Sequence, residues 1–167
     1  MTNRPILVSS CARAATAAEA RFRLPILVRA TWRSARVIAL DAEAAVLVAS
    51  VAERQWHGAR FFTTDPGVVD GAADVVLQGT DNVSSRLSAE LDGADLVVMV
   101  AAAEGGAAVA AAIGLACSLR SIMTAGIVLD GRERTDAVVS ALRPYARVLM
   151  VTRDEQDLAE VLLALRA

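Results

Sequence analysis

The chain has 167 residues and a formal net charge of −2; 55% of its residues are hydrophobic but only 4% are aromatic. This composition excludes a disordered protein and predicts one domain with an aliphatic core, long enough to bury roughly two-thirds of the surface of its unfolded chain. All 17 basic residues are Arg and the only histidine is His57. A lysine nucleophile, a Walker-type phosphate loop and a two-histidine metal site are therefore excluded, and we expect no metal.

The basic charge is concentrated at the N-terminus. Residues 1–36 hold seven Arg and one acidic residue, whereas the rest of the chain holds ten Arg and eighteen acidic residues. Two short apolar runs, at 6–8 and 26–28, favour a folded segment over a targeting peptide or a nucleic-acid arm. We expect residues 1–35 either to add a strand, a helix and a strand to the domain or to fold over it as an arm, and we do not expect a nucleic-acid partner.

Two further features bear on the cellular compartment. Cys11 and Cys117 lack CxxC spacing, which predicts free thiols in a reducing cytoplasm. The apolar run at 94–119 is interrupted by Glu104-Gly105-Gly106 and has no aromatic anchors, so it predicts a strand followed by a helix of a soluble protein and no membrane span.

Strand-like and helix-like segments alternate from residue 36 onward. Apolar runs predict strands at 36–40, 59–63, 74–78, 96–100, 125–129 and 147–152. Helices are expected from an N-cap at Asp41 to about Trp56, from Ser84 or Ser85 to Leu91, from Thr135 or Asp136 to Leu142, and from Asp154 to the end. The alternation predicts a single three-layer α/β domain of Rossmann-like type, with a mostly parallel sheet of five or six strands flanked by helices.

The stretch from 95 to 130 is the centre of this pattern. Two apolar runs enclose a small-residue turn and an Ala-rich helix, which is the pattern of a βαβ unit. Ligands of open α/β sheets bind at the carboxyl ends of the strands, so we expect a site at the turn and assign it to Glu104, Gly105, Gly106 and Ala107. Backbone amides at a helix N-terminus attract anions and Gly permits close approach; alternatively, these residues form a tight turn in which the Glu complements the helix dipole.

Other residues are weaker candidates. Asp65 and Asp130 also follow strands and could bind a ribose or a cation, or could simply form turns. His57 at a helix end and Cys11 after the first apolar run are candidate catalytic groups. The charged loop at 132–134 could hold an anion, and the small residues of the 107–114 helix predict close packing on the sheet or on a second copy.

One family shows a similar order of segments. The matching pieces are ARFFTTD at 59–65, Gly93-Ala94-Asp95 followed by LVVMV, the loop AAAEGGAAVA, the strand AGIVL, the helix at 135–142 and VLMVTRDEQDL. Over roughly residues 36–160 their order and spacing resemble the nucleotide-binding half of the FtsZ/tubulin-like GTPases. The resemblance implies a nucleotide site at 103–109, with GTP or GDP as the first candidate ligand, and assembly into a homo-oligomer such as a homodimer.

The sequence departs from this family at both phosphate loops. Only Gly105 and Gly106 remain of the second loop, and Asp41 and Glu43 place negative charge where the first glycine cluster belongs. The domain that supplies the neighbouring subunit's hydrolytic loop has no counterpart, so efficient GTP hydrolysis is not expected. Our leading hypothesis is a nucleotide-type binding module. The alternatives are a non-catalytic scaffold that keeps the fold without the pocket and a small Rossmann-like enzyme that uses His57 or Cys11.

Overall fold

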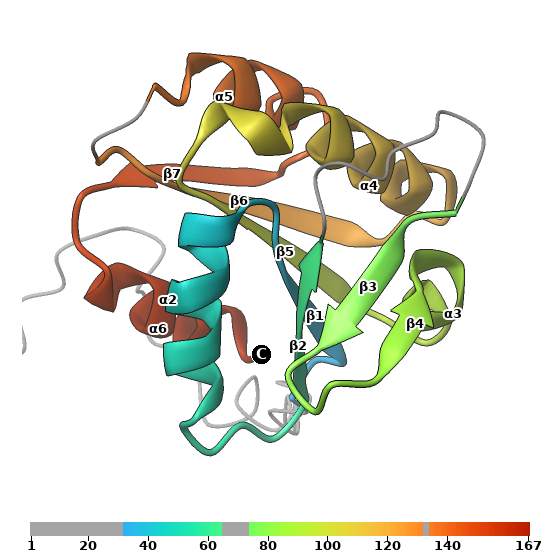
Figure 1. Ribbon diagram of the computed structural model, residues 1–167. Coiled ribbons are helices and arrows are strands. Elements are labelled where there is room, and N and C mark those ends of the chain that lie inside the picture. The colour runs from blue at the N-terminus through green and yellow to red at the C-terminus, as the bar shows by residue number, and fades with distance from the viewer. Residues whose placement is uncertain (1–31, 65–73, 132–133) are drawn as a thin grey trace, which may run out of the picture. The chain divides into compact units, whose positions relative to one another are not determined.

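The computed structural model describes residues 32–64, 74–131 and 134–167 (Figure 1). The expectations for residues 1–31, including Cys11, for Asp65 and its turn, and for the loop residues 132 and 133 lie outside the described residues. In the described part, seven strands form one sheet in the order β4-β3-β2-β1-β5-β6-β7. The predicted three-layer α/β fold is confirmed, with a sheet that is larger than the sequence indicated.

The elements have the following bounds. The strands are β1 (Ala35–Ala39), β2 (Ala59–Thr64), β3 (Val76–Gly79), β4 (Ser84–Arg86), β5 (Leu96–Ala101), β6 (Met123–Leu129) and β7 (Val148–Thr152). The helices are α2 (Ala42–Ala52), α3 (Leu87–Leu91), the 3-10 turn η2 (Glu104–Gly106), α4 (Ala107–Leu119), α5 (Asp136–Leu142) and α6 (Gln156–Leu165). The predicted βαβ unit is therefore confirmed as β5, α4 and β6, whose strands pair in parallel.

Five strands form a parallel core. β1 pairs in parallel with β2 on one side and with β5 on the other, and β6 and β7 continue the sheet beyond β5. The resulting order β2-β1-β5-β6-β7 is one of the two common doubly wound orders, in which the crossover connections change direction between the first strand and its inner neighbour. The carboxyl ends of β1 and β5 therefore flank the switch point of this sheet.

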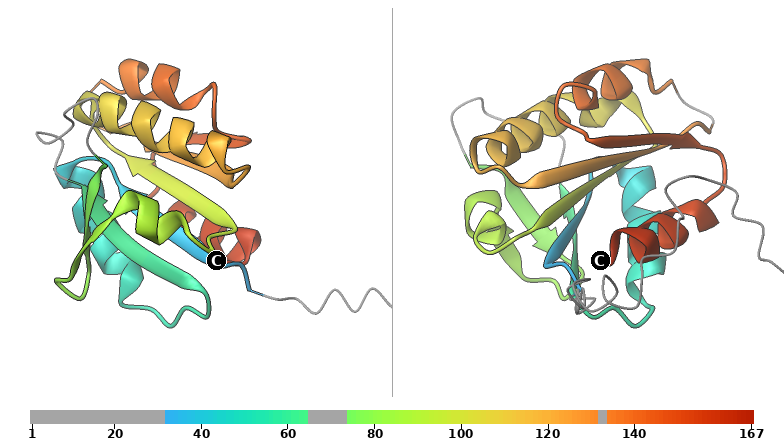
Figure 2. Two further views of the ribbon diagram at one scale, coloured as in Figure 1. Left: turned by 90° about the vertical axis from the view of Figure 1, so that its right-hand side faces the viewer. Right: turned by 180° about the vertical axis from the view of Figure 1, so that it is seen from behind.

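Helices cover both faces of the sheet, as Figure 2 shows with the sheet seen from the side. Helices α2 and α6 pack on one face, against a core that includes Val37, Val98 and Ile127. Helices α3, α4 and α5 pack on the other, against Ile38, Met99 and their neighbours. Adjacent strand residues point to opposite faces, so each continuous apolar run fills two cores, as buried parallel strands do.

Two predicted boundaries were wrong. Ser84 and Ser85 do not cap a helix; they lie in β4, which forms an antiparallel hairpin with β3, and the helix begins at Leu87. The hairpin is closed by Asn82 at φ 61°, a left-handed conformation that Asn adopts more readily than most residues. Helix α2 ends at Ala52 rather than near Trp56, whose indole Nε1 donates a hydrogen bond to the carbonyl of Val51 at the helix end.

Candidate functional site

A buried carboxylate lies at the switch point of the sheet. Asp41 follows β1 and is the N-cap of α2, as predicted, with Oδ1 accepting a hydrogen bond from the amide of Ala44 at 2.8 Å. Its Oδ2 accepts from the amides of Ala102 and Ala103, directly after β5, at 2.8 and 3.1 Å. Asp41 is 5% exposed. The protein's own carboxylate thus uses backbone amides at the position where this kind of sheet binds anionic ligands.

The predicted loop residues lie beside this carboxylate, on the α4 side. Glu104 and Gly105 are exposed, Ala107 is half-buried and Gly106 is buried. A Cβ on Gly106 would come within 2.6 Å of the Leu40 Cβ and 2.9 Å of its carbonyl oxygen, whereas nothing lies within 4 Å at Gly105. The two glycines therefore differ: Gly106 lets the turn pack on the end of β1, whereas Gly105 faces open space.

An open cleft of about 650 Å³ lies at the carboxyl edge, on the α2 side. It is bounded by α2 and by the segments that follow β5, β6 and β7. The residues that line it are Glu43, Val46, Leu47, Ser50, Ala102, Leu129, Asp130, Gly131, Arg153 and Glu155. The size is in the range of small-molecule sites. Its lining combines an aliphatic wall with three carboxylates, one hydroxyl and one guanidinium.

Asp130, which the sequence analysis named as a candidate, lines this cleft. Its Oδ2 accepts hydrogen bonds from Arg153 Nε at 3.1 Å and Nη2 at 2.9 Å, and Oδ1 makes no hydrogen bond within the described residues. The ion pair is exposed and contributes little to stability. Within the described residues, Oδ1 is thus the oxygen that can accept a hydrogen bond from a ligand.

Only some of the predicted site residues line the cleft. Asp130 lines it, Glu104, Gly105, Gly106 and Ala107 do not, and Asp65 lies outside the described residues. Sequence reasoning did not assign Glu43, Ser50, Arg153 and Glu155 to a site, although it placed Glu43 in the first turn of its helix. Arg153 and Glu155 could have been found from the sequence, because they closely follow a strand, as Asp130 does.

His57 lies elsewhere. It precedes β2, at the amino edge of the sheet, where its exposed ring stacks on Trp32 with the ring centroids 4.5 Å apart. It does not line the cleft. Cys117 is buried in α4, and burial raises the pKa of its thiol to about 12, so the thiolate nucleophile is not formed at neutral pH.

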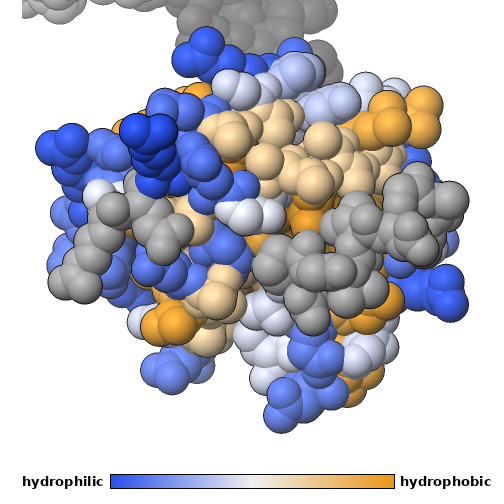
Figure 3. All heavy atoms as spheres, turned by 45° about the horizontal axis from the view of Figure 1, so that its top comes forward, coloured by the Kyte–Doolittle hydropathy of each residue, from blue (hydrophilic) through white to orange (hydrophobic). Residues whose placement is uncertain are grey.

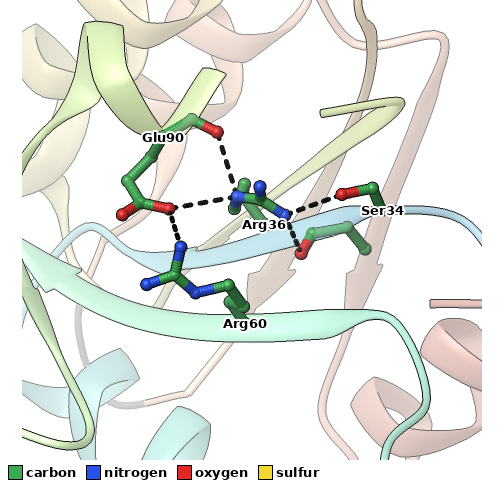
Figure 4. Close-up of polar contacts among 5 residues, drawn as sticks. Ser34, Arg36, Arg60 and Glu90 are labelled. Atoms are coloured by element: carbon green, nitrogen blue, oxygen red, sulfur yellow. Dashed lines mark hydrogen bonds and ion pairs between the residues drawn. The ribbon is translucent and has the colours of Figure 1, made fainter. Parts of the chain in front are cut away.

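A buried ion-pair cluster also lies toward the amino edge (Figure 4). Arg36 and Arg60 are paired positions of β1 and β2, and Glu90 of α3 contacts both, at 3.2 Å from Arg36 Nε and 2.7 Å from Arg60 Nη1. Arg36 also donates to the Glu90 carbonyl oxygen at 2.9 Å and to the Ser34 hydroxyl at 3.0 Å. Burial lowers the pKa of Arg36, and the charge of Glu90 opposes that effect. These contacts join α3 to the sheet.

The described segments lack two other kinds of feature. They contain no group of three or more His, Cys, Asp or Glu side chains placed to hold a metal ion. None of their helices combines the length and apolar character needed to cross a membrane.

Comparison with known proteins identifies no family for this chain. No protein-family model matches the sequence, and no curated protein matches it. The fold is similar to the solved structure of proximal thread matrix protein 1 (PTMP1) from the mussel byssus, at 11% identity and a TM-score of 0.45. That similarity covers 79% of this chain and 44% of the mussel protein, so this chain spans less than half of its length. At this level the likeness supports no functional argument.

Proposed function

We propose that this domain is a binding module for a nucleoside-type ligand, held in the carboxyl-edge cleft with its sugar hydroxyls on carboxylates. The observation that carries the proposal is the position of the cleft beside the switch point, lined by acceptor oxygens and an aliphatic wall. Doubly wound domains commonly bind a ribose through an acidic residue at this edge, and apolar walls suit a base.

The charges favour hydroxyl recognition over phosphate recognition. The Asp41 carboxylate already accepts the amides of Ala102 and Ala103. Glu43, Asp130 and Glu155 add negative charge around the cleft, and Arg153, the one cation among the described residues that line it, is paired with Asp130. A triphosphate placed there would be repelled, whereas a neutral sugar would donate hydrogen bonds to these oxygens. Of a nucleotide ligand, we therefore expect the nucleoside part, and not the phosphates, to bind in the cleft.

Isothermal titration and thermal unfolding with nucleosides test the proposal. We expect adenosine or guanosine to bind more tightly than ATP, GTP or GDP, with or without magnesium, and ligand at 100 times its Kd to stabilise the protein by about 2.7 kcal/mol. Asp130→Asn should weaken binding about tenfold, because it replaces a charged acceptor. Glu160→Gln on α6, outside the cleft, removes the same charge and should leave affinity unchanged. Tighter binding of triphosphates would contradict the proposal.

A second candidate is self-association through the outer face of α4. Leu115 and Leu119, one helical turn apart, are 51% and 77% exposed, and the exposed Ala108 continues the same helix toward its N-terminus. Figure 3 views the molecule from the side of α4 and α5 and shows apolar residues gathered on that surface. The small Ala108, two helical turns before Leu115, allows a second helix to approach closely, so the partner we propose is another copy of this chain.

Light scattering of the purified protein tests the second candidate. A homodimer should become monomeric in Leu115→Glu with Leu119→Glu, while Leu163→Glu, which changes a leucine of similar exposure on α6, should leave it dimeric. A monomeric wild-type protein at all concentrations tested would rule out the second candidate.

A further inference from the structure

A second hollow lies at the opposite edge of the sheet. It has a volume of about 290 Å³, just below the usual range for small-molecule sites. The end of α4, the start of β6 and the segment between α5 and β7 enclose it. We call it the amino-edge groove; its lining residues are Ser118, Ser121, Ile122, Met123, Thr124, Pro144, Tyr145 and Arg147.

The polar side chains that line this groove are hydroxyls and one guanidinium. None of its lining residues is acidic. Arg147 is exposed, and no carboxylate of the described segments forms an ion pair with it. The hydroxyls of Ser118 and Ser121 make no hydrogen bond to any described residue, whereas that of Thr124 donates to the carbonyl of Tyr145. Two hydroxyls and a guanidinium are thus left to meet a ligand.

Neighbouring charges reinforce this character. Arg33 reaches the rim of the groove, where its Nη1 lies 3.4 Å from the sulfur of Met123. Asp95 directly precedes Leu96, which pairs with Met123 of the groove, and its Oδ2 accepts a hydrogen bond from the Ser34 amide. Arg147 and Arg33 thus place two cations at a groove that no described carboxylate side chain lines.

The backbone at Ser121 is a second, independent feature. Ser121 follows the C-cap of α4 at φ 57°, a left-handed conformation in which Gly is the common residue. The amide of Ile122 donates to the Cys117 carbonyl and closes the helix end. Gly would fit this turn with less strain, yet the chain carries a hydroxyl here, at the groove. Ser121 thus adds a hydroxyl to the groove at a position where a helix end commonly has Gly.

We propose that the amino-edge groove binds a small oxyanion, the phosphate or carboxylate group of a metabolite, with Arg147 as its charged partner and Ser118 and Ser121 as neutral donors. Guanidinium groups bind both kinds of anion through paired hydrogen bonds. The groove faces away from the acidic cleft, so this site is independent of the proposed nucleoside site.

The test is an NMR titration of the ¹⁵N-labelled full-length chain with inorganic phosphate, glycerol 3-phosphate and succinate. We expect saturable shifts confined to 118–124 and 145–147, with a Kd in the low-millimolar range or below. Arg147→Gln should weaken binding about tenfold. Arg54→Gln, at the same edge but outside the groove, removes the same charge and should change affinity less than twofold. Tighter binding of the phosphates than of succinate would identify a phosphate site, and the reverse a carboxylate site.

Ser121→Gly separates ligand binding from folding. Because Gly suits the left-handed turn, the variant should unfold at the same or a higher temperature while its anion affinity falls severalfold. Asn82→Gly, at the left-handed position of the β3–β4 turn, is the matched control and should keep full affinity. Shifts spread over all exposed arginines, or equal losses in Arg147→Gln and Arg54→Gln, would overturn the proposal.

Discussion

The two edges of this sheet bury charge in different ways. At the carboxyl edge, the Asp41 carboxylate meets three uncharged backbone amides, which joins the ends of β1 and β5 to the start of α2. Toward the amino edge, Arg36 meets a full countercharge on Glu90. Losing one partner has different costs in the two places: an amide left without a carboxylate is neutral, whereas an arginine left without its glutamate is a buried charge.

The exposed charges also differ between the two edges of the sheet. The described acidic residues that follow the parallel strands outnumber the arginines there. At the other edge the helix C-caps are mixed: Arg120, Arg143 and Arg166 cap α4, α5 and α6, whereas Glu53 and Asp92 cap α2 and α3. Each crossover helix begins at the carboxyl edge, so the three arginines complement the helix dipoles and the two acidic caps oppose them. Arg147 and Arg33 are not helix caps, and the dipoles do not account for them. Four predictions test this comparison, in order of decreasing effect.

The largest effect is expected at the ion-pair cluster. Glu90→Ala leaves Arg36 buried without a countercharge and should lower the free energy of unfolding by about 3 kcal/mol. Arg60→Ala removes the other ion pair, whose arginine side chain is 55% exposed, and should cost under about 1 kcal/mol. Urea unfolding measures both. Equal losses in the two variants would show that the cluster acts as a surface salt bridge.

Asp41→Ala should lower the free energy of unfolding by about 2–3 kcal/mol, because it removes an N-cap and leaves two more amides without their acceptor. Asp154→Ala is the matched control. Asp154 also accepts an amide hydrogen bond near a helix start, from Gln156, but it is exposed and makes no bond across the sheet. That change should cost about 0.5–1 kcal/mol. Calorimetry would contradict the proposed role of Asp41 if the two melting temperatures fell equally.

The glycine pair of η2 provides the third comparison. Gly106→Ala places a Cβ against the Leu40 carbonyl and should cost about 2 kcal/mol, because backbone must move to make room. Gly105→Ala meets open space and should change stability by less than about 0.5 kcal/mol. Thermal unfolding distinguishes them. If Gly105→Ala were more destabilising than Gly106→Ala, the described packing of this turn on β1 would be wrong.

The smallest effect concerns Cys117, which is buried beside the exposed Ser118 of the groove. Because its folded pKa is raised from 9.0 to about 12, its contribution to stability is complete below pH 9 and is lost as the pH rises toward 12. At pH 10 the wild type should have lost about 1 kcal/mol more than Cys117→Ala, relative to pH 7. Urea unfolding at the two pH values measures this difference, and rapid alkylation of Cys117 in the folded protein at pH 8 would contradict its burial.

Local patterns were sufficient to predict much of the fold. The apolar runs at 36–40 and 96–100 fixed two central strands, and Asp41 was recognisable as an N-cap because capping depends on residues adjacent in the chain. The hairpin of Ser84 and Ser85 was missed because serine also caps helices, and only pairing with β3 decides between the two. Asp130 was assigned to the candidate site because it directly follows a strand, and it lines the cleft.

The sequence by itself determined the alternating order of strands and helices, the aliphatic core and the concentration of acidic residues after the strands, all of which depend on neighbours in the chain. The tertiary structure alone decided what meets at each edge. The second Asp41 oxygen bonds amides about sixty positions further along the chain, and Ser118, Ser121 and Arg147 converge because β6 and β7 are neighbours. Contacts of this kind depend on strand order, which local patterns do not specify.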